Sequence, residues 1–223
     1  MGLTDVLHFM YGVENNFKRF RIKDMKNEKT LILIKHDGIQ RSLIGEIIKR
    51  YERVGLKLVG AKMLVPTSEL IESHYTVDPE WRRKTGEKTI KNYREKGKIP
   101  PSEDPLVITG IVLEGLKKYF ITGPVIAMVW QGAHAVQIAR KITGGTEPFS
   151  SADIGTIRGD FALDSYLMSD KDGRVLRNLV HASTSPEEAE KEIALWFRPE
   201  EVIKYKLAQD EILYKPSLEG FLG

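Results

Sequence analysis

The sequence predicts a layered α/β domain, and three observations support this fold class. Three apolar segments of strand-like composition, at residues 30–34, 56–65 and 124–130, alternate with segments of helical periodicity. Such alternation is typical of a sheet covered by helices, and by itself it favours a parallel sheet. The chain has 223 residues, of which 41% are hydrophobic and 29% charged, so it is long enough and ordinary enough in composition to bury a sizeable core.

The first third of the chain is expected to contain two strands and two helices. Residues 30–34 form an uninterrupted apolar run, which is typical of a buried strand, and Lys35 stands at its end. After a predicted turn at 36–38, Ser42 is expected to cap a helix whose apolar side chains share one face and which ends at Gly55. A strand at 56–65 and a short helix at 66–75 follow.

The middle and the end of the chain carry the remaining elements. Charged residues and prolines concentrate at 78–104, which we interpret as an insertion. Ser185, followed by Pro186 and Glu188, predicts the capped start of a helix that runs to about residue 197. The other expected elements are a helix that ends near 119, a strand at 124–130, a helix at 133–142, a functional loop at 145–159, a strand at 161–167 and a turn at 170–173.

Composition excludes several classes of protein. The chain has no cysteine, so it holds neither a disulfide nor a thiolate metal site and is not a secreted disulfide scaffold. The net charge of +3 is too small to indicate nucleic-acid binding by overall electrostatics. No apolar run reaches the length of a membrane span, and the start of the chain lacks a secretory signal pattern. We therefore expect a cytoplasmic protein with no membrane partner.

Two common ligand motifs are absent. Residues 55–63 approach the phosphate-loop pattern, but Lys62 comes one position late and Met63 stands where that pattern needs a hydroxyl group. The histidines have no spacing typical of a zinc site. They are His8, His36, His74, His134 and His181.

His181 is the strongest candidate for a reactive group. It stands at the end of a predicted strand and precedes a run of small residues at 182–185, so little bulk surrounds its imidazole. Glu192 lies two turns into the next helix, from where its carboxylate can bond one ring nitrogen and leave the other free as a nucleophile. A structural histidine held by hydrogen bonds explains the same spacing equally well.

Further residues suit the binding of an oxyanion. Arg140, Thr146 and Arg158 lie in or near the predicted functional loop and offer two guanidinium forks and a hydroxyl group. Lys35 adds a fourth group at a strand end, where α/β proteins usually bind ligands. Taken singly, each arginine is more simply explained as a solvated surface charge.

Several ordered motifs resemble those of nucleoside diphosphate kinases. The run NLVHAS at 178–183, followed by Ser185 and Glu192, is similar to the active-site signature of that family, and so is TIRGDF at 156–161. Four longer segments match in order: TLILIKHDGIQR, GEIIKRYERVGLKLVGAKML, GPVIAMVWQG and KEIALWFRPEEVIKY. The resemblance covers most of residues 30–205, which leaves an N-terminal extension at 1–29 and a C-terminal tail at 206–223.

The resemblance implies a phosphotransferase that works by a ping-pong mechanism. A nucleoside triphosphate such as ATP would phosphorylate His181, and the phosphohistidine would pass the group to a nucleoside diphosphate. Glu192 would orient the histidine, and Ser183 would supply a neighbouring hydroxyl group. Mg²⁺ would be carried by the nucleotide phosphates, without a direct protein ligand. The positions that hold phosphate or ribose correspond to Lys35, Arg140, Thr146, Arg158 and Asn178.

The resemblance also implies a ferredoxin-like βαββαβ sandwich with a four-stranded antiparallel sheet, in place of the parallel sheet that alternation favours. It implies a homo-oligomer, either a hexamer or a tetramer. Two insertions, at about 78–104 and 164–175, set this chain apart, and the first falls where the family has its base-stacking aromatic residue. We expect Trp81 to take the place of that aromatic residue. Leu116 corresponds to a position that contacts the base in the family, and Tyr75 is a further expected site residue.

The first insertion leaves alternatives open. Residues 78–98 include eight basic and four acidic side chains, with Trp81 and Tyr93 among them, which would suit a nucleotide- or nucleic-acid-binding protein. Most charge-rich segments of this kind are solvated helices, so nucleic acid is not the partner we expect. An oligomer contact or a lid over the nucleotide is a further interpretation of the same segment.

Overall fold

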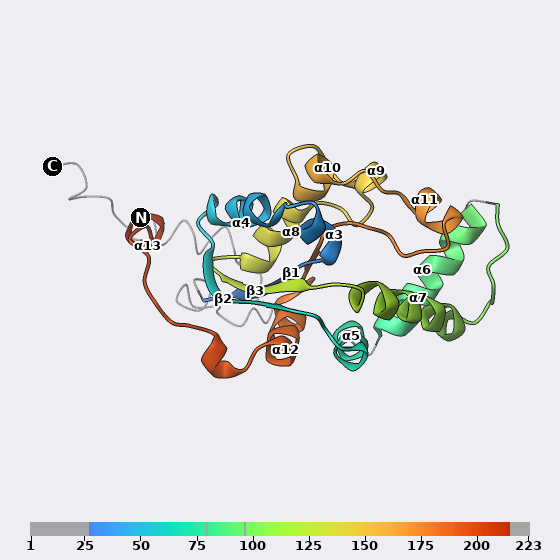
Figure 1. Cartoon of the computed structure of the whole chain (residues 1–223), viewed down its shortest axis with the longest axis horizontal. Coiled ribbons are helices and arrows are strands. Elements are labelled where there is room, and N and C mark those ends of the chain that lie inside the picture. Colours follow the sequence, from blue (N-terminus) through green and yellow to red (C-terminus); the bar gives the residue numbers. More distant parts are fainter. Residues whose placement is uncertain (1–26, 79, 96, 215–223) are drawn as a thin grey trace, which may run out of the picture.

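A four-stranded sheet lies at the centre of the computed structural model, which describes residues 27–78, 80–95 and 97–214 (Figure 1). Every neighbouring pair of strands is antiparallel. The parallel sheet that alternation favours is therefore wrong, whereas the ferredoxin-like sheet implied by the resemblance is confirmed. The strands, in the spatial order β2-β3-β1-β4, are β1 (Lys29–Ile34), β2 (Lys57–Leu64), β3 (Val125–Gln131) and β4 (Val180–Ala182).

Alternation misleads because β3 lies between β1 and β2. Both β1 and β2 run antiparallel to β3, so they share one direction without being neighbours. Helix α4 (Ile44–Glu52) connects β1 to β2, and helix α8 (Ala135–Thr143) connects β3 to β4. The order of helices and strands along the chain is the same whether β1 and β2 are neighbours in the sheet or a third strand lies between them.

The two faces of the sheet carry separate cores. On one face, Ile32 and Trp130 pack beneath α4 and α8. On the other, Leu31 and Val129 pack against α5 (Ser68–Tyr75) and α12 (Pro186–Trp196). Figure 1 shows these two helices together on one side of the sheet. Because successive strand residues face opposite sides, residues 30–34 are all fully buried, which confirms the predicted buried strand and explains its uninterrupted apolar run.

Capping residues mark the helix starts unevenly. The Ser185 side chain accepts the N–H of Glu188 at the start of α12, as predicted, and Thr67 caps α5 in the same way. The predicted cap at Ser42 is wrong: Ser42 has a φ of 56° and belongs to the turn before α4, whose N-cap is Leu43. A left-handed residue cannot adopt the extended conformation that a serine cap requires.

Helices replace several segments that were predicted to be irregular or extended. The predicted strand at 161–167 is wrong, because one helix ends at Phe161 and Ser165 caps the next. A bidentate ion pair between Arg174 and Asp164 fixes this segment by polar contacts rather than by strand pairing. The helices at the predicted turn, loop and strand are α3 (His36–Gln40), α9 (Pro148–Ser151), α10 (Ile157–Phe161) and α11 (Tyr166–Lys171).

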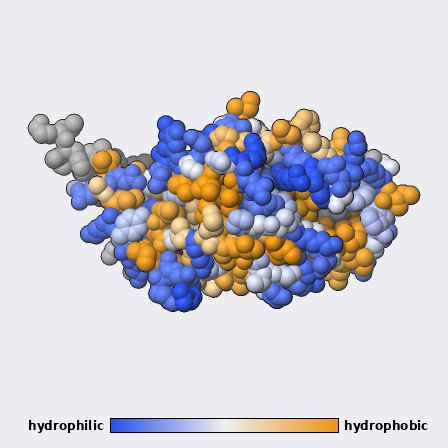
Figure 2. Space-filling view, in the orientation of Figure 1, coloured by the Kyte–Doolittle hydropathy of each residue, from blue (hydrophilic) through white to orange (hydrophobic). Residues whose placement is uncertain are grey.

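Two long helices extend the molecule at one end. Helices α6 (Trp81–Glu95) and α7 (Pro105–Phe120) pack side by side (Figure 1). Gly86 lies against the backbone of Pro105, and the Thr109 hydroxyl group donates to the Arg82 carbonyl. Apolar side chains interrupt the hydrophilic surface at this end (Figure 2). Within the described residues, no helix combines the length and apolar character needed to cross a membrane.

The terminal segments are described only in part. Of the predicted N-terminal extension, residues 1–26 lie outside the described residues. Glu28 accepts the Gly132 and Val136 N–H groups, and β1 begins one residue later. After a 3-10 helix, η1 (Pro199–Glu201), the tail contains helix α13 (Asp210–Tyr214), beyond which 215–223 are also outside the described residues.

Candidate active site

A strained turn presents His181 on strand β4. His181 lies opposite Leu33 of β1, and two residues before it the buried Leu179 adopts a left-handed conformation with a φ of 66°. This conformation costs a residue other than glycine about 1–3 kcal/mol. The Leu179 carbonyl accepts the Lys35 N–H at 2.8 Å, and the Leu179 N–H donates to Asp37 Oδ2 at 3.2 Å. These bonds tie the ends of β1 and β4 together.

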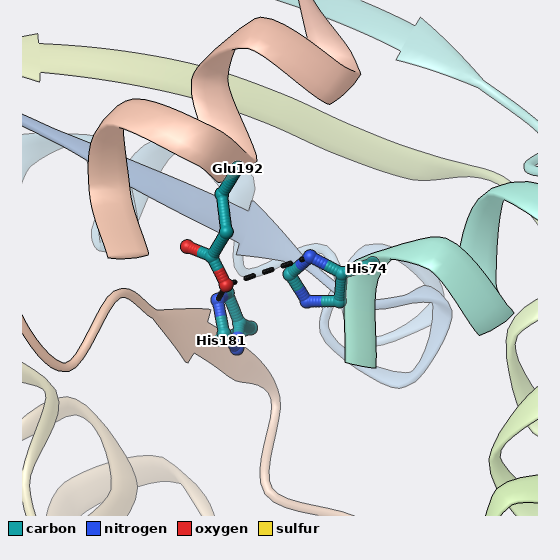
Figure 3. Close-up of side chains that lie close together, drawn as sticks. All are labelled: His74, His181 and Glu192. Atoms are coloured by element: carbon teal, nitrogen blue, oxygen red, sulfur yellow. Dashed lines mark ion pairs between the residues drawn. The ribbon is translucent and has the colours of Figure 1, made fainter. Parts of the chain in front are cut away.

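Glu192 reaches from α12 to the imidazole of His181. Its Oε1 atom lies 2.9 Å from Nε2 of His181 (Figure 3). Its other oxygen, Oε2, accepts a hydrogen bond of 2.6 Å from the Ser183 hydroxyl group, which in turn accepts the Leu31 N–H at 3.1 Å. Because Glu192 and Ser183 are buried, the carboxylate is held in place without a ligand. His181 Nε2 therefore faces the carboxylate, and Nδ1 points away from it.

Burial keeps His181 neutral. Loss of solvation lowers the pKa of His181 far below 6.5, and the positive charges of Lys35, Arg158 and Arg140 lower it further, against the opposing effect of Glu188. A neutral imidazole carries a lone pair on one nitrogen, which a nucleophile needs. The site is therefore poised for nucleophilic attack at neutral pH.

A second histidine lies beside this pair. His74, near the end of α5, is buried, and its ring meets the His181 ring edge-on with the centroids 4.4 Å apart. Its Nδ1 atom accepts the indole N–H of Trp196 at 3.2 Å and lies 3.5 Å from Glu192 Oε1. Burial lowers the pKa of His74 to about 3, so this imidazole is neutral as well.

Lys35 and Asn178 form the polar wall of the site. Lys35 Nζ donates to Asn178 Oδ1 at 2.7 Å, and Asn178 Nδ2 donates to the backbone carbonyl of Thr146 at 2.8 Å. Both side chains are buried. Burial and the nearby Arg158 charge lower the pKa of Lys35 to about 8, against the raising effect of Asp37.

Arg158 ties together the loops that carry these groups. Its Nε donates to the Asn178 carbonyl at 3.2 Å and its Nη2 to the Val180 carbonyl at 2.6 Å. Its Nη1 donates to the carbonyls of Gly144 and Gly145 at 3.0 and 3.1 Å. These bonds leave one of the five guanidinium N–H groups for a ligand, so Arg158 serves the site partly as a structural clamp.

The remaining predicted site residues surround this centre. Arg140, at the end of α8, and Thr146 are exposed. The rings of Tyr75 and Trp81 contact each other at a centroid distance of 5.4 Å. Leu116 is half-buried against the core formed with α5 and α12. The structure thus brings the predicted histidine, carboxylate, serine, lysine and asparagine together. It places Tyr75 on α5 and the expected base contacts Trp81 and Leu116 on α6 and α7.

Sequence reasoning missed His74 and Trp196. His74 has no zinc-like spacing to another histidine, and Trp196 lies within a segment that matches the family without a feature that marks it. One signal was available, because His74 directly precedes Tyr75, which the resemblance had already assigned to the site. That neighbour does not reveal a contact with α12, which arises only when α5 and α12 pack on the same face of the sheet.

The side chains of the site fit a nucleotide-borne Mg²⁺ better than a metal bound directly by the protein. His74, His181 and Glu192 place ligand atoms within 4.8 Å of one another. However, His74 Nδ1 is engaged by Trp196, and one Glu192 oxygen is engaged by Ser183. Mg²⁺ prefers several oxygen ligands and usually binds through substrate phosphates, which the nearby cationic groups would attract.

Comparison with known proteins identifies the family. The model of the nucleoside diphosphate kinase family matches residues 28–92 and 111–202. The chain belongs to the nucleoside diphosphate kinase family. The nucleoside diphosphate kinase of Pyrobaculum aerophilum is 47% identical over 184 residues, which cover 81% of this chain and 100% of that protein. That of Aspergillus fumigatus is 41% identical over 191 residues, covering 86% and 99% of the two chains.

Solved nucleoside diphosphate kinases share the fold as well. The crystal structure of the Pyrobaculum aerophilum enzyme has a TM-score of 0.76 and 45% identity, covering 80% of this chain and 100% of that chain. A transition-state mimic of the Borrelia burgdorferi enzyme with bound vanadate and ADP has a TM-score of 0.69 and 34% identity, covering 84% and 97%. As a nucleoside diphosphate kinase, this chain is a phosphotransferase that uses the phosphohistidine mechanism general to its family.

Proposed function

We propose that His181 carries the phosphoryl group on Nδ1 during the transfer between nucleotides. The observation that carries this assignment is the contact between Nε2 of His181 and Glu192 Oε1 at 2.9 Å. A carboxylate only accepts hydrogen bonds, so this contact favours the tautomer with its proton on Nε2, which leaves the lone pair on Nδ1. The depressed pKa of His181 supports the same state, because the ring is neutral at pH 7.

The reaction then proceeds in two balanced halves. The Nδ1 lone pair attacks the γ-phosphorus of a nucleoside triphosphate, an N–P bond forms, and the bond to the β-phosphate oxygen breaks to release the diphosphate. A β-phosphate oxygen of a second nucleoside diphosphate attacks the same phosphorus, and the N–P bond breaks. Glu192 stabilises the positive charge that the ring develops at Nε2–H when Nδ1 is bonded.

The cationic groups around His181 hold the phosphates. Lys35 and the remaining Arg158 N–H group face developing negative charge in a buried setting, where electrostatic stabilisation is strong. Arg140 and Thr146 are exposed and available to phosphate, and Asn178 offers its amide to phosphate or ribose. Mg²⁺ bound to the nucleotide would neutralise phosphate charge. Tyr75, Trp81 and Leu116 are proposed to contact the base or line its site, which stacking alone would leave tolerant of different bases.

Organisation beyond the site is also a proposal. We assign the kinase domain to residues 30–205, with insertions at about 78–104 and 164–175, an N-terminal extension at 1–29 and a C-terminal tail at 206–223. The protein works in the cytoplasm as a homo-oligomer, a hexamer or a tetramer, and takes ATP and other nucleoside tri- and diphosphates. Light scattering of the intact chain tests the assembly, and a monomeric mass would contradict it.

Nucleic-acid binding receives no support from α6, because acidic side chains neutralise much of its basic charge. The pairs are Arg82 with Glu72, Arg83 with Glu80 and Glu87, Lys84 with Asp78, Lys91 with Glu95, and Arg94 with Glu103. A surface that binds the phosphate backbone needs free cations, and its affinity falls steeply with salt.

The decisive experiment follows the phosphoryl group. Incubation with γ-labelled ATP and Mg²⁺ should label the protein at His181, and GDP should remove the label as GTP. His181→Ala should abolish both labelling and turnover, whereas His134→Ala, which changes an exposed histidine on α8's N-terminal side, should retain both. Acid-labile label that persists in His181→Ala would overturn the assignment.

A further inference from the structure

Two histidines compete for one carboxylate oxygen. Glu192 Oε1 lies 2.9 Å from His181 Nε2 and 3.5 Å from His74 Nδ1, as both dashed lines in Figure 3 show. The other oxygen, Oε2, is occupied by the Ser183 hydroxyl group at 2.6 Å. A proton on His74 Nδ1 would therefore draw Glu192 away from His181.

Trp196 decides where the proton of His74 resides. The indole nitrogen of Trp196 is only a donor, and it donates to His74 Nδ1 at 3.2 Å. His74 Nδ1 must therefore present its lone pair, and the neutral ring carries its proton on Nε2. No partner within the described part of the chain accepts a bond from the buried Nε2. The indole alone thus selects this tautomer, at the cost of one unsatisfied donor.

We propose that Trp196, acting through His74, is a positioning residue for the phosphorylated histidine. By fixing His74 as the Nε2–H tautomer, the indole reserves Glu192 Oε1 for the Nε2–H group of His181. His181 then keeps its lone pair on Nδ1, where phosphorylation takes place. This inference deepens the proposed function and rests on the assignment of His181 as the phosphorylated residue.

Ring packing strengthens the same arrangement. His74 meets the His181 ring at an interplanar angle of 79° and the Trp196 ring at 87°.

The Glu192 oxygen lies off the N–H direction of His181, so a rotation of the His181 imidazole is needed to align the hydrogen bond between them. The rotated His181 forms this hydrogen bond only if His74 Nδ1 does not already donate a proton to Oε1.

The first test measures the histidine tautomers in the unsubstituted protein. In the intact protein labelled with ¹⁵N-histidine, His74 and His181 should both show a protonated Nε2 and an unprotonated Nδ1 at pH 7.5. His74→Gln and His181→Gln serve only to assign the signals. A protonated Nδ1 on His74 in the unsubstituted protein would overturn the proposal.

The second test removes the indole donor and keeps an aromatic ring. Trp196→Phe should move His74 towards its Nδ1–H tautomer and lower the rate of His181 phosphorylation at saturating Mg-ATP by about 10-fold, the effect of one lost hydrogen bond. The ATP concentration for half-maximal rate should stay within about 2-fold, because no phosphate contact changes. Trp130→Phe, at a buried tryptophan in the core beneath α4 and α8, is the matched control and should leave the tautomers unchanged.

A double substitution separates tautomer control from packing. His74→Phe removes the competing donor, so Trp196→Phe should cause no further loss of phosphorylation rate in that background. An equal loss in both backgrounds would assign Trp196 a packing role and refute the proposal. Absence of label on His181 in the unsubstituted protein would refute the proposed function instead, whereas the tautomer measurement does not depend on phosphorylation.

Discussion

The carboxylate of Glu192 is the single group on which the geometry of the site depends most, because it contacts residues from β4 and α5. Glu192→Gln keeps the shape of this side chain and removes its charge. We expect the rate of His181 phosphorylation to fall by about 10- to 100-fold, since a buried hydrogen bond to a charged group contributes roughly 1.5–3 kcal/mol. Single-turnover labelling measures the rate. Glu190→Gln, an exposed position on the same helix, should change it by less than about 2-fold.

The buried histidines should make folding stability depend on pH. Burial lowers the pKa of His74 to about 3 and that of His181 below 6.5, so both residues bind protons more readily in the unfolded chain. The stability that they contribute is therefore fully present above pH 6.5 and is lost as pH falls from 6.5 towards 3. Urea unfolding at pH 7.5 and 5.5 should show a smaller difference for His74→Phe than for the unsubstituted chain. Equal differences would contradict this expectation.

Local spacing predicts some single residues well and others not at all. Glu192 is expected to reach His181 because it lies two turns into α12, from where its side chain can point back to the strand. The structure brings the two side chains together. The contact between His74 and Trp196 joins α5 to α12, and no local pattern encodes it. Arg158 looked like a phosphate ligand, yet most of its N–H groups bond to backbone carbonyls.

Among the elements, the packing of α6 on α7 offers a sharp test. A Cβ atom on Gly86 would lie 2.0 Å from the Pro105 carbonyl oxygen, so Gly86→Ala must push the helices apart. We expect a loss of about 1–3 kcal/mol, the usual cost of overpacking. Gly110→Ala on α7 meets no atom within 4 Å and should stabilise the protein by about 0.5–1 kcal/mol. Chemical unfolding measures both values, and equal effects would show that the two glycines are equivalent.

Both capping chemistry and hydrophobic patterns predicted most elements and failed where tertiary contacts decide the conformation. Ser185 caps its helix as expected, because a side chain that satisfies a backbone N–H acts over three residues, whereas the expected cap at Ser42 is wrong. The segment at 161–167 is expected to be a strand, but the structure has the end of one helix and the start of another there. Its conformation is set instead by polar partners from other segments, including the bond from the Tyr166 N–H to the Glu147 carboxylate.

For the molecule as a whole, nucleotide binding should raise stability. A ligand that binds only the folded state at a concentration 100-fold above its dissociation constant adds about 2.7 kcal/mol. Mg-ADP should therefore shift the urea midpoint upward, whereas adenosine, which lacks phosphates, should have far less effect at the same concentration. His181→Ala should keep the Mg-ADP shift, because Lys35 and Arg158 remain. Loss of the shift in that variant would show that His181 itself holds the diphosphate.

Global architecture was predictable only with help from the ordered motifs. Alternation of strands and helices predicted the correct layers and the wrong strand direction. The periodicity of apolar residues does not reveal which strands, distant along the chain, pair with each other. The charge-rich segment at 78–104 was recognised as unusual from composition, but its packing as a helix against α7 depends on the close approach at Gly86.

The order in which the site is assembled along the chain has a consequence for its synthesis. Lys35 is made early, whereas His181 on β4 and Glu192 and Trp196 on α12 are made late. The Leu31 N–H of β1 donates to the hydroxyl group of Ser183, which directly follows β4, so the site closes only after the last strand has been made. A nascent chain still on the ribosome therefore cannot transfer phosphate until α12 has emerged. Phosphorylation of the proposed site histidine is therefore expected only after β4 and α12 have been made and have packed on the sheet.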